Sequence, residues 1–302
     1  MTHVYASAAY AESLAHIGRA VDVAPWGGFV LAREISGGGE DLTGAYPLAS
    51  LAADARLRDG LDALAAAGFV SVVLVPDPLR GPAQAAWAQA FDLCQPFKTH
   101  YLIEPGQGYA PTKHHRDRIR RGARRCAVEI VALGDHLAEW RDLYAGLAAR
   151  RAIGGPAAFS EASFAAMARD ARFTAFAARF EGRIVAMTIW FACDGVVYNH
   201  LTAADAEGYA NGAVYALYDA AVARFGGEGV INLGGGAGFA DNADDGLATF
   251  KRGFANARVK ALLCGAVLDR ARYAALSQGV QTDFFPAYRA PRLRSESARD
   301  AA

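Results

Sequence analysis

A glycine-rich turn and a single lysine lie close together near the C-terminal end of the sequence. Residues 230–236 read VINLGGG, a β-branched strand pattern that runs into three glycines, and FK follows at 250–251 within a helical pattern that starts at Asp244 or Asp245. Glycine lets the backbone approach a ligand closely and tolerates positive φ. A positioned lysine or backbone N–H can stabilise the oxyanion that forms when an amine attacks an ester or thioester. The alternative is a flexible connection followed by a surface lysine beside a core phenylalanine.

A second group of polar side chains stands in the strand pattern VVYNHL at 196–201. Side chains alternate along a strand, so Tyr198 and His200 should share one face while Asn199 points to the other. His200 could accept the proton of an attacking amine, because histidine titrates near neutral pH. The alternative is a histidine that is satisfied on a sheet face. The sequence has no GxSxG elbow, which argues against serine hydrolase chemistry.

Positive charge is concentrated in KHHRDRIRRGARR, residues 113–125. This segment has a net charge of +6, and the rest of the chain therefore has −6, since Lys+Arg and Asp+Glu both total 31. At helical spacing Arg116, Arg120 and Arg124 share one face and Arg121 lies beside it, so the segment could bind phosphates. The alternative is a solvated helix paired with surplus acids.

The elements that must position these residues follow one another in a regular order after residue 112. Hairpin-like joints, EGR and CDG, connect three strand patterns and predict antiparallel pairing. The predicted helices of this half lie at 113–125, 135–151, 160–170, 211–226 and 244–254, and its strands at 126–133, 173–180, 183–192, 195–203, 230–235 and 258–269. Earlier in the chain the patterns predict strands at 28–33, 69–75 and 98–104 and helices at 57–68 and 85–94.

Length and composition indicate a two-lobed enzyme of ordinary globular type. The 302 residues exceed the usual length of one domain, and EPGQGYAPT at 104–112 is a Pro- and Gly-rich boundary. We therefore predict a first lobe at 1–110, a second at 111–290 and a polar tail at 291–302. The four dispersed cysteines predict reduced thiols and no metal site, and the lack of a signal sequence or long apolar run predicts a cytoplasmic protein without a membrane span.

The order of elements resembles the GNAT acyltransferase fold. Several amino-acid segments resemble its Fem-type branch, the peptidyl aminoacyltransferases built from two GNAT lobes. The segments that carry this resemblance are RDRIRRGARR, FEGRIVAMTIWF, INLGGG and FKRGF. The resemblance implies an α/β fold of two GNAT-like lobes, each a mixed, largely antiparallel sheet flanked by helices. It also implies that the strands at 196–202 and 230–236 diverge to hold the donor and that Lys251 works in the active site. The predicted donor-binding residues are Tyr198, Asn199, Asn232, Gly234, Gly235, Gly236 and Phe250.

One departure from acetyl-CoA-dependent GNAT enzymes bears on the donor. Their [RQ]xxGx[GA] loop holds a pyrophosphate, whereas TAADAEGYANGAVYAL here has Asp205 and Glu207 and no Arg or Gln at the first position. Acidic side chains would repel a pyrophosphate. We therefore expect aminoacyl-tRNA as co-substrate, no bound cofactor, and a small amine or peptide-like acceptor. An acyl-CoA-dependent N-acetyltransferase is the alternative, and a non-catalytic nucleic-acid-binding module is a third hypothesis.

Overall fold

The computed structural model describes residues 2–238 and 241–290, so the predicted tail at 291–302 lies outside the described residues. The strands are β1 (Arg19–Val23), β2 (Gly28–Glu34), β3 (Glu40–Gly44), β4 (Ser71–Leu74), β5 (Leu93–Ile103), β6 (Ala127–Val131), β7 (Phe173–Phe180), β8 (Arg183–Cys193), β9 (Val196–Ala204), β10 (Val230–Asn232) and β11 (Ala257–Val267). The α-helices are α1 (Ala8–Ser13), α2 (Leu57–Ala66), α3 (Gln84–Ala90), α4 (Lys113–Arg125), α5 (Leu137–Arg151), α6 (Glu161–Arg169), α7 (Ala206–Asn211), α8 (Ala213–Phe225), α9 (Gly246–Arg252) and α10 (Arg270–Leu276). Short 3₁₀ turns are η1 (Val4–Ala6), η2 (Ala24–Trp26), η3 (Leu133–His136), η4 (Gly155–Ala157) and η5 (Ala287–Arg289).

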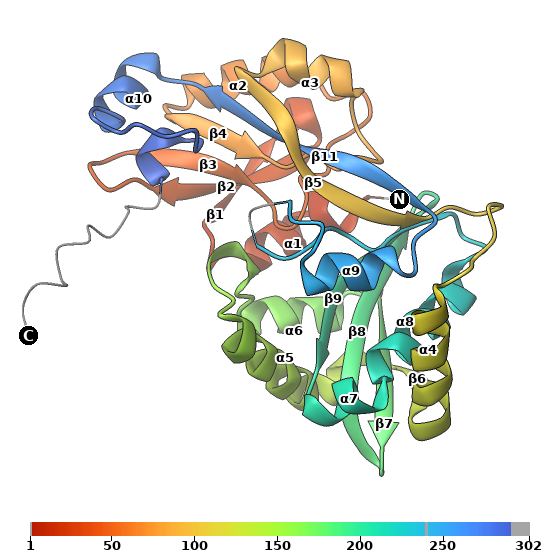
Figure 1. The fold of residues 1–302 in the computed structure, drawn as a ribbon. Coiled ribbons are helices and arrows are strands. Elements are labelled where there is room, and N and C mark those ends of the chain that lie inside the picture. The colour runs from red at the N-terminus through yellow and green to blue at the C-terminus, as the bar shows by residue number, and fades with distance from the viewer. Residues whose placement is uncertain (1, 239–240, 291–302) are drawn as a thin grey trace, which may run out of the picture.

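All these strands belong to one continuous sheet, in the order β1-β2-β3-β4-β11-β5-β10-β9-β8-β7-β6. Neighbours pair antiparallel except at β3–β4 and β9–β10, which are parallel. The prediction of an α/β fold with a mixed, largely antiparallel sheet flanked by helices is confirmed. The two lobes share this sheet, and Figure 1 shows them joined where β5 and β11 cross between them.

β11, the last strand along the chain, pairs with strands of the first lobe. It lies between β4 and β5 and pairs antiparallel with both. As a result, α10 lies beside the first-lobe strands although it follows the second lobe in sequence (Figure 1). The same pairing brings the sulfur atoms of Cys94 and Cys264 to 3.1 Å. No observation tests the lobe boundary near residue 110, which stays a prediction.

Helices cover both faces of the second-lobe strands, and β8 is accordingly buried along almost its whole length. One face packs against α1, α5 and α6, with Trp140 and Phe164 in its core. The other face packs against α8, with Trp190 and Phe254 in its core. Strands buried on both faces read as continuous apolar runs, which explains why RIVAMTIWFAC is recognisable from its sequence.

The sheet diverges between β9 and β10, as the resemblance implied. Their parallel pairing ends at Asn232 opposite Tyr198, while β9 continues to Ala204. β10 pairs with β5 on its other side, and beyond Asn232 the chain keeps its bonds to β5 alone, through Leu233 N to Tyr101 O at 2.9 Å. Gly234 then turns the chain with φ +80°, a conformation that favours glycine. The turn thus leaves the second half of β9 without a partner on this side among the described strands.

Three sequence-based boundaries differ from the structure. The helix predicted at 85–94 ends at Ala90, because Phe91 is extended and β5 begins at Leu93 rather than at 98. Around Phe97 the pairing of β5 with β11 shifts register, a bulge that accommodates Pro96. The strand predicted at 230–235 is only Val230–Asn232. None of the helices in the described part of the chain has the length and apolar character needed to cross a bilayer.

Candidate functional site

Lys251 lies inside the protein, directed at the glycine-rich turn. Its helix, α9, starts at Asp245, whose carboxylate accepts hydrogen bonds from Leu247 N at 2.8 Å and Ala248 N at 3.0 Å. The Lys251 residue is 8% exposed, and its Nζ donates to the carbonyl oxygen of Gly235 at 2.7 Å. The structure therefore brings together the lysine and the glycines, which are the features that the sequence singled out.

Burial lowers the pKa of the Lys251 ammonium to about 7. The negative charge of Asp245 opposes this shift, and the positive charge of Lys98 adds to it. Loss of water around an ammonium favours its neutral form, which explains the direction. Near neutral pH the group can therefore exist both as a cation and as a neutral amine.

Within the site a side chain would clash at Gly236 and be crowded at Gly234, whereas Gly235 has ordinary van der Waals space. A Cβ at Gly234 would lie 3.0 Å from Lys251 Nζ, and a Cβ at Gly236 would lie 2.4 Å from Asp245 Oδ2. A Cβ at Gly235 would lie 3.4 Å from Thr99 O. The turn is thus held between α9 on one side and β5 of the first lobe on the other.

β5 contributes two polar side chains that the sequence analysis missed. Lys98 is 6% exposed and its Nζ donates to Ala237 O at 2.9 Å. His100 is 7% exposed, and its Nδ1 lies 3.2 Å from Asn232 Oδ1. That amide oxygen also accepts the N–H of Gly234 at 2.8 Å. The first lobe therefore forms one wall of the site.

His115 connects the arginine-rich helix α4 to the segment that carries Lys251. Its Nε2 lies 2.8 Å from Phe250 O, and its Nδ1 lies 2.8 Å from Thr112 Oγ1. Because a carbonyl oxygen only accepts, Nε2 carries the proton and Nδ1 accepts from the threonine hydroxyl. The ring also packs edge-on against Phe254 at 4.7 Å. The signal that could have found His115 is its position three residues after a Thr N-cap.

Phe250 belongs to an aromatic cluster on the α8 side of the sheet. Its ring centroid lies 4.9 Å from that of Tyr215 and 4.8 Å from that of Tyr218. The Tyr218 hydroxyl donates to Asn199 Oδ1 at 2.7 Å. Tyr218 thereby connects two of the predicted donor-binding residues, Phe250 and Asn199.

Tyr198 and His200 lie on the opposite face of β9, as their alternation predicted. The Tyr198 hydroxyl donates to Asp77 at 2.6 Å, and His200 Nδ1 lies 3.0 Å from the Tyr5 hydroxyl. Burial lowers the pKa of His200 to about 3, and its Nε2 is enclosed with no hydrogen-bond partner among the described residues. Neither Lys251 nor the glycine turn is among its described contacts. The structure thus does not bring His200 to the predicted site.

The arginine side chains of α4 lie mostly in solvent. Arg116, Arg120, Arg121 and Arg124 are all exposed. Arg120 pairs with Asp117 at 3.0 Å and Arg116 donates to Pro111 O at 2.5 Å. The side chains of Arg121 and Arg124 make no hydrogen bond or ion pair with any residue that the structure describes. These two positions can therefore offer charge to a partner.

The buried face of α4 covers the start of α8. A Cβ at Gly122 would lie 2.4 Å from Gly212 O, so the two helices meet backbone to backbone. Arg118 Nη2 donates to Tyr209 O at 2.8 Å. The N-terminal end of α8, where an acyl-CoA pyrophosphate would be expected to bind, is accordingly packed against protein.

The two acids of the preceding loop are paired within the protein. Asp205 caps α7 by accepting Gly208 N at 2.8 Å. Arg183 binds Asp205 at 2.6 Å and also binds Glu207. One arginine thus compensates part of the negative charge that we expected to repel a pyrophosphate.

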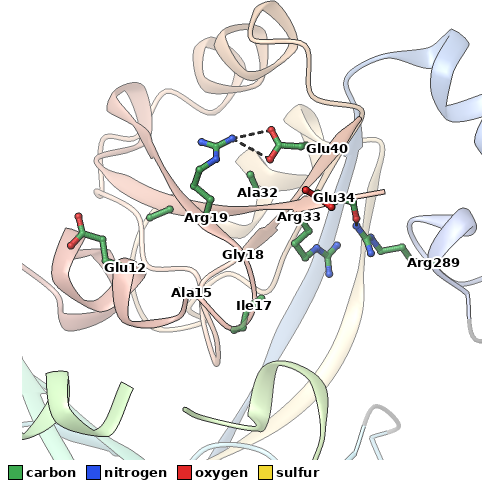
Figure 2. Close-up of a pocket in the computed structure, with 11 residues that line it drawn as sticks. Glu12, Ala15, Ile17, Gly18, Arg19, Ala32, Arg33, Glu34, Glu40 and Arg289 are labelled. Atoms are coloured by element: carbon green, nitrogen blue, oxygen red, sulfur yellow. Dashed lines mark hydrogen bonds and ion pairs between the residues drawn. The ribbon is translucent and has the colours of Figure 1, made fainter. Parts of the chain in front are cut away.

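A surface cavity of about 780 Å³ lies in the first lobe and is lined by none of the predicted site residues. Figure 2 shows Arg19 reaching Glu40 there, at 2.9 Å. Arg33 and Arg289 both bind the buried Asp41. Because the arginines of this cavity are paired internally, we do not assign the candidate site to it.

Comparison with known proteins places this geometry in context. Residues 113–252 match the family described as acetyltransferase (GNAT) domain. No curated protein matches the chain.

Solved structures share the fold over nearly the whole chain. FemX has a TM-score of 0.63 at 12% identity, covering 90% of this chain and 94% of its own. The C-terminal domain of a putative lysylphosphatidylglycerol synthetase from Agrobacterium fabrum has a TM-score of 0.60 at 16% identity, covering 89% of each chain. L-PGS from Bacillus licheniformis has a TM-score of 0.58 at 13% identity, covering 89% of this chain and 95% of its own. The fold implied by the resemblance is confirmed.

Proposed function

We propose, from the match of residues 113–252 to the GNAT acetyltransferase domain family and from the geometry of the site, that the protein forms an amide by moving an aminoacyl group from aminoacyl-tRNA to an amine. The observation that carries the proposal is the buried Lys251 Nζ, which meets the glycine turn where β10 leaves β9. The acceptor would be a small amine or a peptide-like molecule.

In this proposal the acceptor nitrogen attacks the ester carbonyl carbon directly, without a covalent enzyme intermediate. The carbonyl oxygen then becomes negative, and a protonated Lys251 would stabilise it together with backbone N–H groups of the turn. The C–O bond to the donor breaks and the amide forms. Phe250 and its aromatic neighbours would shape the wall beside the donor.

Three observations support tRNA rather than coenzyme A as the carrier. The start of α8 is covered by α4, which leaves its N-terminal backbone less open to a pyrophosphate. The same α4 presents exposed arginines that suit a phosphate backbone. A structural relative, lysylphosphatidylglycerol synthetase, also has an aminoacyl group, lysyl, in its name.

The alternative donor is an acyl-CoA. The description of the matched family as acetyltransferase favours it, as does Arg183, which compensates the loop acids. A non-catalytic nucleic-acid-binding module remains the third hypothesis. Both transfer hypotheses predict a new amide product, whereas the third predicts none.

The test is a donor screen with the intact protein. Charged tRNA or acyl-CoA is incubated with an amine pool, and new amides are sought by mass spectrometry. We expect amide product with charged tRNA. Product with acyl-CoA alone would move the assignment to the alternative, and no product with either donor would overturn the transfer proposal.

Lys251→Ala should lower kcat about 100-fold, the usual scale for one oxyanion-stabilising group, while donor binding changes far less. Arg252→Ala is the matched control, because Arg252 neighbours Lys251 but is exposed. Equal losses in kcat and donor binding for Lys251→Ala would contradict the role of Lys251 in the transition state.

A further inference from the structure

His100 is a buried histidine of the first lobe whose contacts fix its tautomer. Its Nδ1 faces the side-chain oxygen of Asn232 at 3.2 Å. The N–H of Gly234 donates to that same oxygen at 2.8 Å, which fixes the orientation of the amide. An amide oxygen only accepts hydrogen bonds, so Nδ1 must carry the proton of the neutral ring. The lone pair of His100 is therefore on Nε2.

That lone pair is not used within the protein. His100 Nε2 makes no hydrogen bond with any residue that the structure describes. His100 is only 7% exposed, so the ring is almost enclosed by the protein. A basic nitrogen thus lies beside the glycine turn without a hydrogen-bond partner among the described residues.

The His100 ring lies against the same turn as Lys251. A Cβ at Gly235 would lie 3.6 Å from His100 Cδ2, and the carbonyl of Gly235 accepts the Lys251 ammonium. Burial lowers the pKa of His100 to about 4, and the positive charges of Lys251 on α9 and Lys98 on β5 add to this. The hydrogen bond to Asn232 and the charge of Asp241 oppose it. The ring is accordingly neutral at physiological pH.

We propose that His100, supplied by the first lobe, is the proton shuttle of the transfer reaction. This inference rests on the proposed function. When the amine nitrogen bonds to the acyl carbon, its extra proton passes to His100 Nε2. When the ester C–O bond breaks, Nε2 returns that proton to the leaving oxygen. The ring ends as it began, and the products are an amide and a free hydroxyl, so no further reactant is needed.

Asn232 is the positioning residue of this arrangement. It is 1% exposed, and its oxygen ties the ring of β5 to the end of β10. A ring held by Nδ1 presents Nε2 in one direction, as general acid–base catalysis requires.

The test compares His100→Ala and His100→Asn with the wild type, using amide formation from charged tRNA as the readout. The asparagine amide can replace Nδ1 as donor to Asn232 while removing Nε2, so this variant keeps the fold. We expect both variants to lose about 100-fold in kcat, the scale of a general base, with little change in donor binding. Added imidazole should restore part of the His100→Ala activity, which a purely structural role would not allow.

His200→Ala is the control, and it should show no rescue by imidazole. Amide formation at the wild-type rate by His100→Asn would overturn the shuttle while leaving the proposed function intact. Absence of product from the wild type would overturn both. Nitrogen-15 NMR of the intact protein provides a readout independent of activity, because a proton on Nε2 rather than on Nδ1 would also contradict the proposal.

Discussion

At the scale of single residues, Lys251 is a buried ammonium group that has lost most of its hydration. Its hydrogen-bond partner is the backbone carbonyl of Gly235, and the negative charge of Asp245 partly compensates its positive charge. A buried ammonium without a carboxylate in contact pays the loss of its hydration, and groups with such shifted pKa values gather at functional sites. The buried lysine also restricts the glycine turn, because a Cβ at Gly234 would lie 3.0 Å from its Nζ.

The shifted pKa of Lys251 predicts a specific pH dependence of stability. Between the folded value of about 7 and the ordinary 10.5, the unfolded chain binds a proton that the folded chain does not, so the free energy of unfolding should rise with pH across this window. Lys251→Met should remove this rise, which we expect to be on the order of a few kcal/mol.

The measurement is urea denaturation of the wild type and Lys251→Met at intervals from pH 7 to pH 10. Lys113→Met is the control, because Lys113 is exposed, and its curve should run parallel to that of the wild type. Parallel curves for the wild type and Lys251→Met would show that Lys251 titrates as an ordinary lysine.

At the scale of elements, the sequence indicates best those features that depend on near neighbours. The strands β7, β8 and β9 follow from apolar runs and short turns, and the Lys251 helix follows from its acidic cap. β1 and β3 escape detection because RAVDV and EDLTG are short and charged. The site residues on β5 escape for another reason: His100 acquires its role only by pairing with Asn232, a contact made 132 residues further along the chain.

For His200 the local sequence pattern predicts the secondary structure but not the contacts of the side chain. Alternation correctly separates its face of β9 from that of Asn199, but nothing local indicates which face meets the site. The structure places His200 among Tyr5, Tyr10 and Phe159. Tertiary packing therefore decides the role of a residue whose secondary structure is predictable.

The contact between α4 and α9 predicts that His115 supports catalysis through position. His115→Ala removes the hydrogen bond to Phe250 O and leaves that carbonyl without this donor, so we expect about 1–3 kcal/mol of lost stability and a lower kcat. His114→Ala is the matched control, because His114 is adjacent but exposed. Thermal unfolding and turnover would be measured together. An unchanged melting temperature for His115→Ala would argue against this link between the helices.

At the scale of the whole molecule, the basic segment belongs to the second lobe, and elements of both lobes build the site. The chain is neutral overall, yet residues 113–125 have a net charge of +6. α4 thus combines a buried face, which closes the start of α8 through Gly122, with an exposed basic face. The shared sheet allows β5 of the first lobe and α9 of the second to meet at one turn, so a two-lobed chain can build a single site.

This charge distribution predicts how RNA binding should depend on salt. Each phosphate contact releases condensed counterions, so Arg121→Ala combined with Arg124→Ala should weaken tRNA binding and reduce the slope of log K against log salt by about 2. Arg258→Ala on β11 is the control, because Arg258 is also exposed but lies outside α4. Fluorescence anisotropy with labelled tRNA over a range of salt concentrations gives both slopes. An unchanged slope in the double variant would mean that α4 is a solvated surface helix and that tRNA, if it binds, is held elsewhere.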